Sequence, residues 1–83
     1  MIIFRERADF SFSNMEGAQL VGIKALCANM ESCNLQNCNF EDPGGLRSNL
    51  EGVNLKNACL ENSNMAGVDL RVANLKGANI KVT

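Results

Sequence analysis

Large apolar side chains recur at every fifth position along most of this chain. From residue 10 to residue 80, only Ala25 and Gly45 interrupt the series. Its members are Phe10, Met15, Leu20, Met30, Leu35, Phe40, Leu50, Leu55, Leu60, Met65, Leu70, Leu75 and Ile80. In an α-helix five residues advance the direction by about 500°, and in a flat strand every fifth side chain alternates faces. One buried row at this spacing therefore requires the backbone to turn once in every five residues.

The positions around each fifth residue repeat as well. A small residue usually stands two positions before it, and Asn or Asp stands one position before it. Two positions after it, Gly and Asn are common, and both tolerate the positive φ that several tight turns require. We name the five positions the small, Asn, core, variable and turn slots. The unit runs fifteen times from Ala8 to Val82 without insertion or deletion, and such a repeat predicts a coil of stacked turns.

Two units depart from the pattern and indicate the length of one coil. They are Ile23-Lys24-Ala25 and Pro43-Gly44-Gly45, which lie twenty residues apart, and each is followed by a leucine. The spacing predicts twenty-residue coils in which the two departures stack. Leu26 and Leu46 would then turn inward to fill the space left at these units. The alternative is two unrelated surface loops.

Coils of twenty residues predict four inward columns. These are Phe10–Met30–Leu50–Leu70, Met15–Leu35–Leu55–Leu75, Leu20–Phe40–Leu60–Ile80 and Ala25–Gly45–Met65. Coils paired at the usual strand spacing of ~4.8 Å would give a rod roughly 18 Å long. The Asn side chains would also stack, and would hydrogen-bond along the axis as amide ladders do in stacked sheets.

The repeat resembles that of the pentapeptide-repeat family, whose pattern is A(D/N)LXX. Matching stretches include Ala8-Asp9-Phe10, Ala28-Asn29-Met30, Ser48-Asn49-Leu50, Ala73-Asn74-Leu75 and Ala78-Asn79-Ile80. The resemblance implies an all-β fold, a right-handed quadrilateral β-helix of about four coils of 20 residues. It covers residues 8–83 as one repeat domain and leaves residues 1–7 as an N-terminal extension or partial cap.

Three segments resemble, more closely, the C-terminal repeat region of an animal potassium-channel tetramerisation-domain (BTB/POZ) protein. They are residues 38–46, 49–52 and 69–73. The likeness implies a substrate-reading part of a BTB/POZ ubiquitin-ligase adaptor. This reading makes the chain a protein-interaction scaffold whose partner binds the outward slots.

The net charge of the chain argues against nucleic-acid binding and DNA mimicry. A formal net charge of −1 provides no electrostatic attraction to nucleic acid. It also disfavours a gyrase-protecting mimic of DNA, which would need a strongly anionic rod. In twenty-residue coils Glu31 would stack with Glu51 and Glu41 with Glu61, on opposite sides. Each like pair is unfavourable, so these four glutamates are the candidate partner surface. A solvated face is the alternative.

The residues for catalysis and for metal binding are missing from the sequence. The chain has no His, so a Cys or Ser nucleophile lacks its usual base, and no Cys-x-x-Cys spacing suggests zinc. We therefore expect no enzyme activity, no cofactor and no metal. Cys33 and Cys38 occupy small slots, which indicates reduced thiols and a cytoplasmic or nuclear location. No membrane segment is expected.

A self-assembling structural module remains the second functional hypothesis. End coils of such a stack expose unpaired N–H and C=O groups, which favour pairing with another chain. The sequence therefore also predicts a homodimer formed by stacking of end coils.

Overall fold

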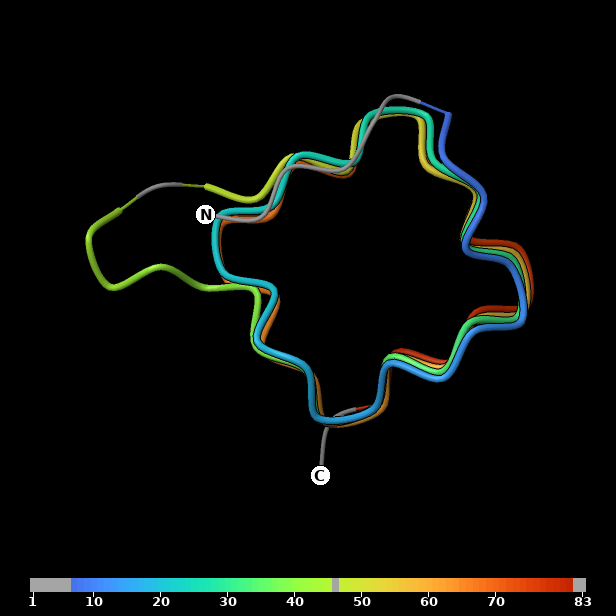
Figure 1. Cartoon of the computed structure of the whole chain (residues 1–83), viewed down its shortest axis with the longest axis horizontal. Helices are drawn as coiled ribbons and strands as arrows, with labels where there is room; N and C mark the ends of the chain where they lie inside the picture. Colours follow the sequence, from blue (N-terminus) through green and yellow to red (C-terminus); the bar gives the residue numbers. More distant parts are fainter. Residues whose placement is uncertain (1–6, 46, 82–83) are drawn as a thin grey trace.

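The computed structural model describes residues 7–45 and 47–81, and it forms a stack of coils around a common interior (Figure 1). No helix forms among these residues, and β pairing consists of single-residue parallel bridges. The all-β prediction is therefore confirmed. The molecule measures 31 × 31 × 21 Å, so it is squat, with its coil axis along the shortest dimension (Figure 1).

The bridges join residues in the Asn slots and arrange them in four columns. Column 1 is Asp9–Asn29–Asn54–Asn74, column 2 is Asn14–Asn34–Cys59–Asn79, column 3 is Gln19–Asn39–Asn64, and column 4 is Lys24–Asn49–Asp69. The first and second coils are offset by 20 residues, the second and third by 25, and the third and fourth by 20. The second coil therefore contains one additional unit of five residues.

This additional unit makes the predicted inward columns wrong beyond residue 45. The observed core columns follow the bridges, and they are Phe10–Met30–Leu55–Leu75, Met15–Leu35–Leu60–Ile80, Leu20–Phe40–Met65 and Ala25–Leu50–Leu70. The repeat does contain an insertion. Its length equals one unit, so the five-residue phase continues unchanged on both sides of it.

The inserted segment leaves one corner of the coil as a loop, which is drawn yellow-green on the left of Figure 1. We call residues 41–45 and 47 the corner loop. Pro43, Gly44 and Gly45 have no large apolar side chain to bury, so the interior gains little by retaining them. The Ser48 hydroxyl closes the base of the loop by donating a hydrogen bond to the Phe40 carbonyl oxygen at 2.8 Å.

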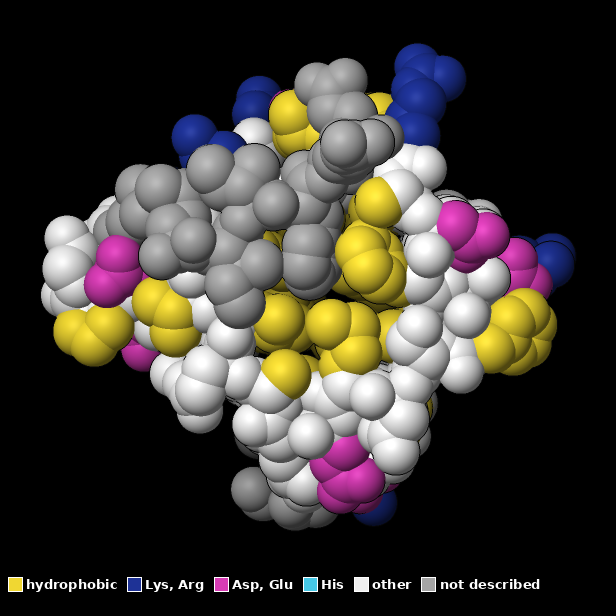
Figure 2. Space-filling view, in the orientation of Figure 1, with side chains coloured by type: hydrophobic (Ala, Val, Ile, Leu, Met, Phe, Trp, Pro, Cys, Tyr) yellow, Lys and Arg dark blue, Asp and Glu magenta, His cyan; other side chains and the backbone are white. Residues whose placement is uncertain are grey.

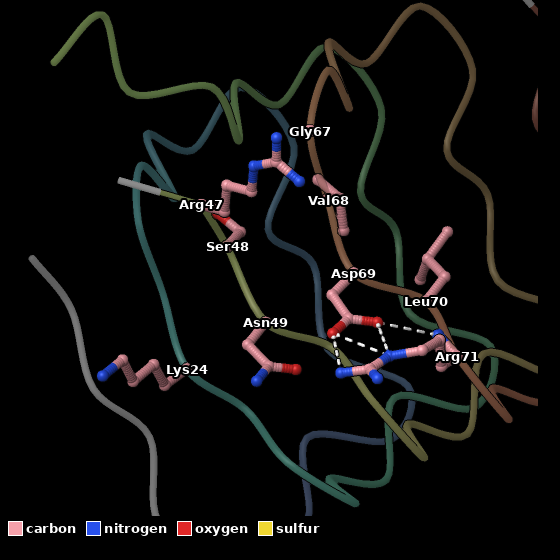
Figure 3. A pocket seen from close by; sticks show the side chains of 9 residues that line it. All are labelled: Lys24, Arg47, Ser48, Asn49, Gly67, Val68, Asp69, Leu70 and Arg71. Carbon is pink, nitrogen blue, oxygen red and sulfur yellow. Dashed lines mark hydrogen bonds and ion pairs between the residues drawn. The ribbon is translucent and has the colours of Figure 1, made fainter. Parts of the chain in front are cut away.

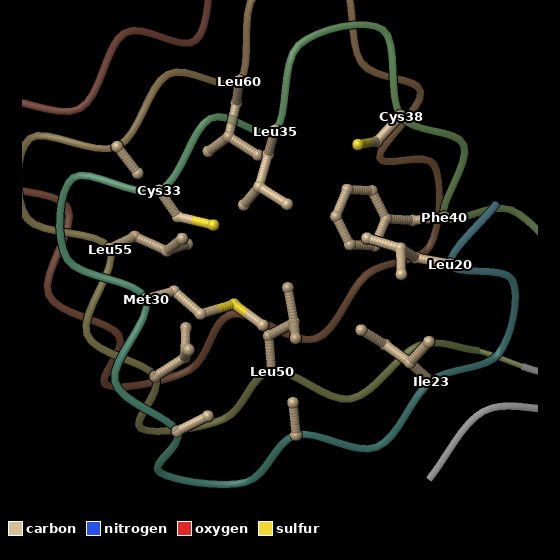
Figure 4. Packing of buried hydrophobic residues seen from close by; sticks show 14 residues of the cluster. Leu20, Ile23, Met30, Cys33, Leu35, Cys38, Phe40, Leu50, Leu55 and Leu60 are labelled. Carbon is tan, nitrogen blue, oxygen red and sulfur yellow. The ribbon is translucent and has the colours of Figure 1, made fainter. Parts of the chain in front are cut away.

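The other departing unit, at Ile23–Ala25, stays in the coil. Ile23 occupies the small slot and is fully buried, and it points into the interior beside Leu20 and Phe40 (Figure 4). It fills the space next to Ala25, so the prediction that Leu26 turns inward is wrong: Leu26 is half-buried, as most variable-slot residues of the middle coils are. Leu46 lies outside the described residues. The two departing units do not stack, because Lys24 bridges to Asn49.

Each corner of the coil repeats one turn. At most corners the residue in the small slot donates its N–H to the carbonyl oxygen of the core residue three positions earlier, as Val53 does to Leu50 at 3.1 Å. The Cys38 N–H instead donates to the Ser63 hydroxyl at 3.1 Å. Every described turn-slot residue outside the corner loop has positive φ, as the frequent Gly and Asn in this slot predict. Asp42 is the point where the chain leaves the coil.

The Asn slots hold the corners and join the coils. The side-chain oxygen of Asn29 accepts the N–H of Glu31 at 3.1 Å, and most other Asn-slot residues make the same local bond. Two axial amide contacts also form, from Asn39 to Gln19 and from Asn54 to Asn29, each 3.3 Å long. The predicted stacking of Asn side chains is thus present, and each one also caps its own turn.

Burial is complete only in the middle of the stack. Large side chains that are essentially inaccessible include Met30, Leu35, Phe40, Leu50 and Leu55, which converge in Figure 4. Phe10 and Met15 in the first coil are only partly buried. Seen along the axis, apolar side chains lie in the centre of the molecule and charged ones at its rim (Figure 2).

Candidate interaction surface

The four glutamates of the predicted partner surface lie on four different columns. Each stands two residues after an Asn-slot residue, which places Glu31 on column 1, Glu61 on column 2, Glu41 on column 3 and Glu51 on column 4. The predicted stacking of Glu31 with Glu51, and of Glu41 with Glu61, is therefore wrong. The cause is again the inserted unit, which shifts the third coil by one column.

These glutamates meet neutral or basic neighbours in the adjacent coil. Glu51 lies 3.5 Å from the Arg71 guanidinium. Glu41 accepts a hydrogen bond from the Asn64 amide at 3.1 Å, and Glu61 accepts one from Asn79 at 3.3 Å. Like charges are thus kept apart, and no acidic face unites the four side chains.

The corner loop borders two hollows on the surface. On one side of its base lies a hollow of about 580 Å³, which we call the basic hollow (Figure 3). Its polar lining comes from Lys24, Arg47, Asn49, Asp69 and Arg71. Three of these residues, Lys24, Asn49 and Asp69, are the whole of column 4, so the hollow extends across three coils.

Arg71 and Asp69 neutralise each other at the edge of the basic hollow. The guanidinium donates to both Asp69 carboxylate oxygens, and the shortest of these contacts is 2.7 Å (Figure 3). These side-chain hydrogen bonds from Arg71 hold the pKa of Asp69 below its usual value. Both groups face solvent, which screens the pair.

On the other side of the loop base, a second hollow of about 220 Å³ carries the opposite charge. Glu41 and Asp42 line it together with Gly45, Arg47 and Gly67. Arg47 borders both hollows. The corner loop therefore separates an acidic surface from a basic one.

A scan against protein-family models bears on what these coils are. The model described as pentapeptide repeats matches residues 6–42 and 48–81, in eight copies. The chain belongs to the pentapeptide-repeat family. The gap between the two matched stretches, residues 43–47, lies between Asn39 and Asn49, where the bridges show one additional unit, so the family pattern and the structure agree on the region of the insertion.

Two curated proteins are similar to part of this pentapeptide-repeat chain. One is the BTB/POZ domain-containing protein KCTD9 of Mus musculus, 58% identical over 36 residues, which are 43% of this chain and 11% of that protein. The other is KCTD9 of Homo sapiens, 59% identical over 32 residues, which are 39% of this chain and 8% of that protein. The chain thus spans about a tenth of the length of these relatives. Both the family and the likeness fit a protein-interaction module.

The cysteines of this pentapeptide-repeat chain differ in their exposure to solvent. Cys33 and Cys38 are buried, whereas Cys27 is exposed. Burial raises the pKa of the Cys33 thiol to about 11. Among residues 7–45 and 47–81, no group of His, Cys, Asp and Glu side chains is arranged to hold a metal ion. The same residues form no helix of the length and apolarity that crossing a bilayer requires.

Sequence reasoning did not single out Lys24 or Arg47. A signal for Lys24 was available, because it is the one basic residue in an Asn slot. Arg47 carried no such signal. Its role at the base of the loop depends on the inserted unit, which a period of five residues cannot reveal.

Proposed function

We propose that this chain is a non-catalytic protein-interaction scaffold, built as a right-handed, four-sided β-helix. The observation that carries the proposal is the corner loop. The bridged coils on both sides of it are regular, whereas residues 41–45 and 47 leave the coil and border hollows of opposite charge. Binding residues are commonly held on loops that a rigid framework positions.

Within this proposal, the chain serves as the substrate-reading part of a BTB/POZ ubiquitin-ligase adaptor. Support comes from the two similar proteins, which are named as BTB/POZ domain-containing proteins. The scaffold acts without a cofactor and in the cytoplasm or nucleus. Its partner is a protein rather than nucleic acid or a membrane, because a net charge of −1 offers no electrostatic attraction to either.

Deleting residues 43–47 tests the scaffold directly. The deletion joins Asp42 to Ser48 and restores an uninterrupted repeat, in which the Ser48 N–H stands three residues after Phe40 and can make the usual turn bond. We expect the deletion variant to melt at the same temperature as wild type, or slightly higher, since a shorter loop costs less entropy. It should nevertheless lose the proteins that wild type retains in crosslinking capture.

A matched control replaces residues 43–47 with Gly and Ser and keeps the loop length. If capture is lost in both variants, the side chains of the loop bind the partner. If the deletion variant captures the same proteins as wild type, the corner loop is not the recognition element and the proposal fails.

End-to-end assembly is the second candidate function, and the C-terminal coil favours it. An apolar hollow of about 280 Å³ opens there, lined by Leu60, Ser63, Met65, Leu70, Leu75 and Ile80. Within the described chain, the backbone N–H groups of Leu70, Leu75 and Ile80 have no hydrogen-bond partner, whereas the corresponding group of Leu55 donates to Asn74. A coil of a second copy carries carbonyl groups at the same five-residue spacing.

Sedimentation of Ile80→Lys against wild type tests this assembly. Ile80 is 56% exposed, so the substitution leaves the fold intact while placing a charge on the stacking face. We expect wild type to dimerise at high concentration and the variant to stay monomeric. Phe12→Lys, which alters an apolar corner residue that is 75% exposed, is the control and should still dimerise. A wild type that remains monomeric at all concentrations contradicts the assembly.

A further inference from the structure

Three departures from the repeat pattern lie at or beside column 4. Lys24 occupies an Asn slot there, so the turn after it lacks the side-chain acceptor that most Asn-slot residues supply. Val72 stands three residues after Asp69, the last residue of column 4. It is a β-branched residue at φ 51°, a backbone conformation that is energetically unfavourable for such side chains. The corner loop rejoins the coil at this column as well. Local rules are broken most often where function requires it.

The basic hollow has a positive charge that its own acids do not balance. Asp69 is held by Arg71, and Arg71 also faces Glu51 at 3.5 Å. In residues 7–45 and 47–81, neither Lys24 nor Arg47 forms an ion pair. Two cations from different coils therefore remain available on the walls of one cavity (Figure 3).

We propose that the basic hollow binds an acidic segment of the partner protein, with two carboxylates paired to Lys24 and Arg47. The Asn49 amide offers a donor between them, and the half-buried side chains of Val68 and Leu70 offer apolar contact to the residue between the two acids. The inference rests on the proposed scaffold function and adds the chemistry of its partner.

A peptide fits these observations better than nucleic acid does. Binding to a phosphate backbone draws most of its affinity from many basic residues along a groove. Here only two cations, Lys24 and Arg47, lack an acidic partner among the described residues of the hollow, and Glu41 and Asp42 line the adjoining hollow that shares Arg47. Those two carboxylates would repel a long polyanion and would leave a short acidic segment unaffected.

Fluorescence anisotropy with defined probes tests the inference. The probes are a labelled peptide Gly-Glu-Val-Glu-Gly, the same peptide with Gln in place of Glu, and a labelled ten-nucleotide oligothymidine. We expect the Glu peptide to bind the wild type, and the Gln peptide to bind at least about tenfold more weakly through loss of two exposed ion pairs. Oligothymidine binding tighter than the Glu peptide would overturn the assignment.

The variants locate the site. Lys24→Gln combined with Arg47→Gln should weaken the Glu peptide about tenfold, with an unchanged circular dichroism spectrum. The control is Lys76→Gln with Lys81→Gln, which removes the same charge from columns 1 and 2 and should change binding less than about twofold by loss of the general field. Equal losses in both pairs, or no binding by wild type, would refute a specific site.

Failure here is distinguishable from failure of the scaffold function. If the Lys24 and Arg47 double variant captures the same partners as wild type while deletion of residues 43–47 abolishes capture, the scaffold stands and the acidic-ligand site is wrong. If the deletion leaves capture intact, the scaffold proposal itself is wrong. In that case peptide binding that is lost only in the Lys24 and Arg47 variant still supports the site.

Discussion

The middle coils and the C-terminal coil are built from the same five-residue unit, but the unit contributes differently to stability in the two places. Leu55 and Leu75 occupy the same core column, yet Leu55 is 0% exposed and Leu75 is 37% exposed. The backbone N–H of Leu55 donates to Asn74 at 2.8 Å, whereas the coil that would accept from Leu75 does not exist in the described chain. The energy of a repeat slot thus depends on whether a coil lies on both sides of it, as nearest-neighbour stacking requires.

Truncating these two leucines should show the largest difference. Leu55→Ala removes packing above and below and should lower the free energy of unfolding by ~2–5 kcal/mol. Leu75→Ala should lower it by less than about 1 kcal/mol, because the side chain already contacts water. Urea unfolding measures both values. Equal losses would break the comparison and would mean that the end coil is covered in solution.

The turn slots provide a reciprocal test across the same two regions. Val72, in the C-terminal coil, has φ 51° and is 84% exposed, while Asn57, in a middle coil, has φ 59°. Val72→Asn should stabilise the fold by about 1 kcal/mol, because Asn tolerates the left-handed region, and Asn57→Val should destabilise it by about 1–2 kcal/mol. Thermal melts of both variants test the pair. A loss of stability in Val72→Asn would show that the valine makes a contact that offsets its strain.

The period of five residues was enough to predict the coil, its core slots and its turns, because burial and positive φ act within one unit. It was not enough to predict which units stack. An insertion of five residues keeps every residue in its slot, so Leu50 and Leu55 were assigned to core positions correctly and to core columns incorrectly. Gly45 in a core slot was the one sign that the unit had nothing to bury.

The glutamate stacking predicted for the candidate surface is wrong for the same reason. Its four glutamates were grouped by counting in twenties, whereas contacts between coils depend on the register after the corner loop. Lys24 and Arg47 come together through a loop whose path no repeat specifies. Only the local part of that site, a cation in place of Asn at position 24, was visible in the sequence.

Titration of the buried thiol gives a smaller effect confined to the middle coils. Burial raises the pKa of Cys33 from 9.0 to about 11, so its neutral form stabilises the fold below the unfolded pKa and that contribution is lost as pH rises toward 11. We expect stability to fall between about pH 9 and 11, and Cys33→Ala to show a shallower fall. Urea unfolding across this range measures it. An identical fall in the variant would assign the effect to other groups.

The smallest effect is expected at the exposed ion pair between Arg71 and Asp69 in the C-terminal coil. Arg71→Met removes the hydrogen bonds that lower the pKa of Asp69, so that pKa should rise toward its ordinary value of 3.8. Because the folded pKa is the lower one, the contribution of Asp69 to stability is present at neutral pH and is lost as pH falls through it. Carboxyl NMR titration follows the change. An unshifted Asp69 would mean that its own backbone contacts suffice.

The Ser48 hydroxyl and the Phe40 carbonyl mark the two ends of a detour that the stack accommodates without changing phase. Any segment of a whole number of units, entering after Phe40 and returning at Ser48, would leave every later side chain facing as before. This corner is therefore a natural insertion site for engineering. Foreign peptides of five, ten or fifteen residues could be displayed there, on a support whose interior does not depend on their sequence.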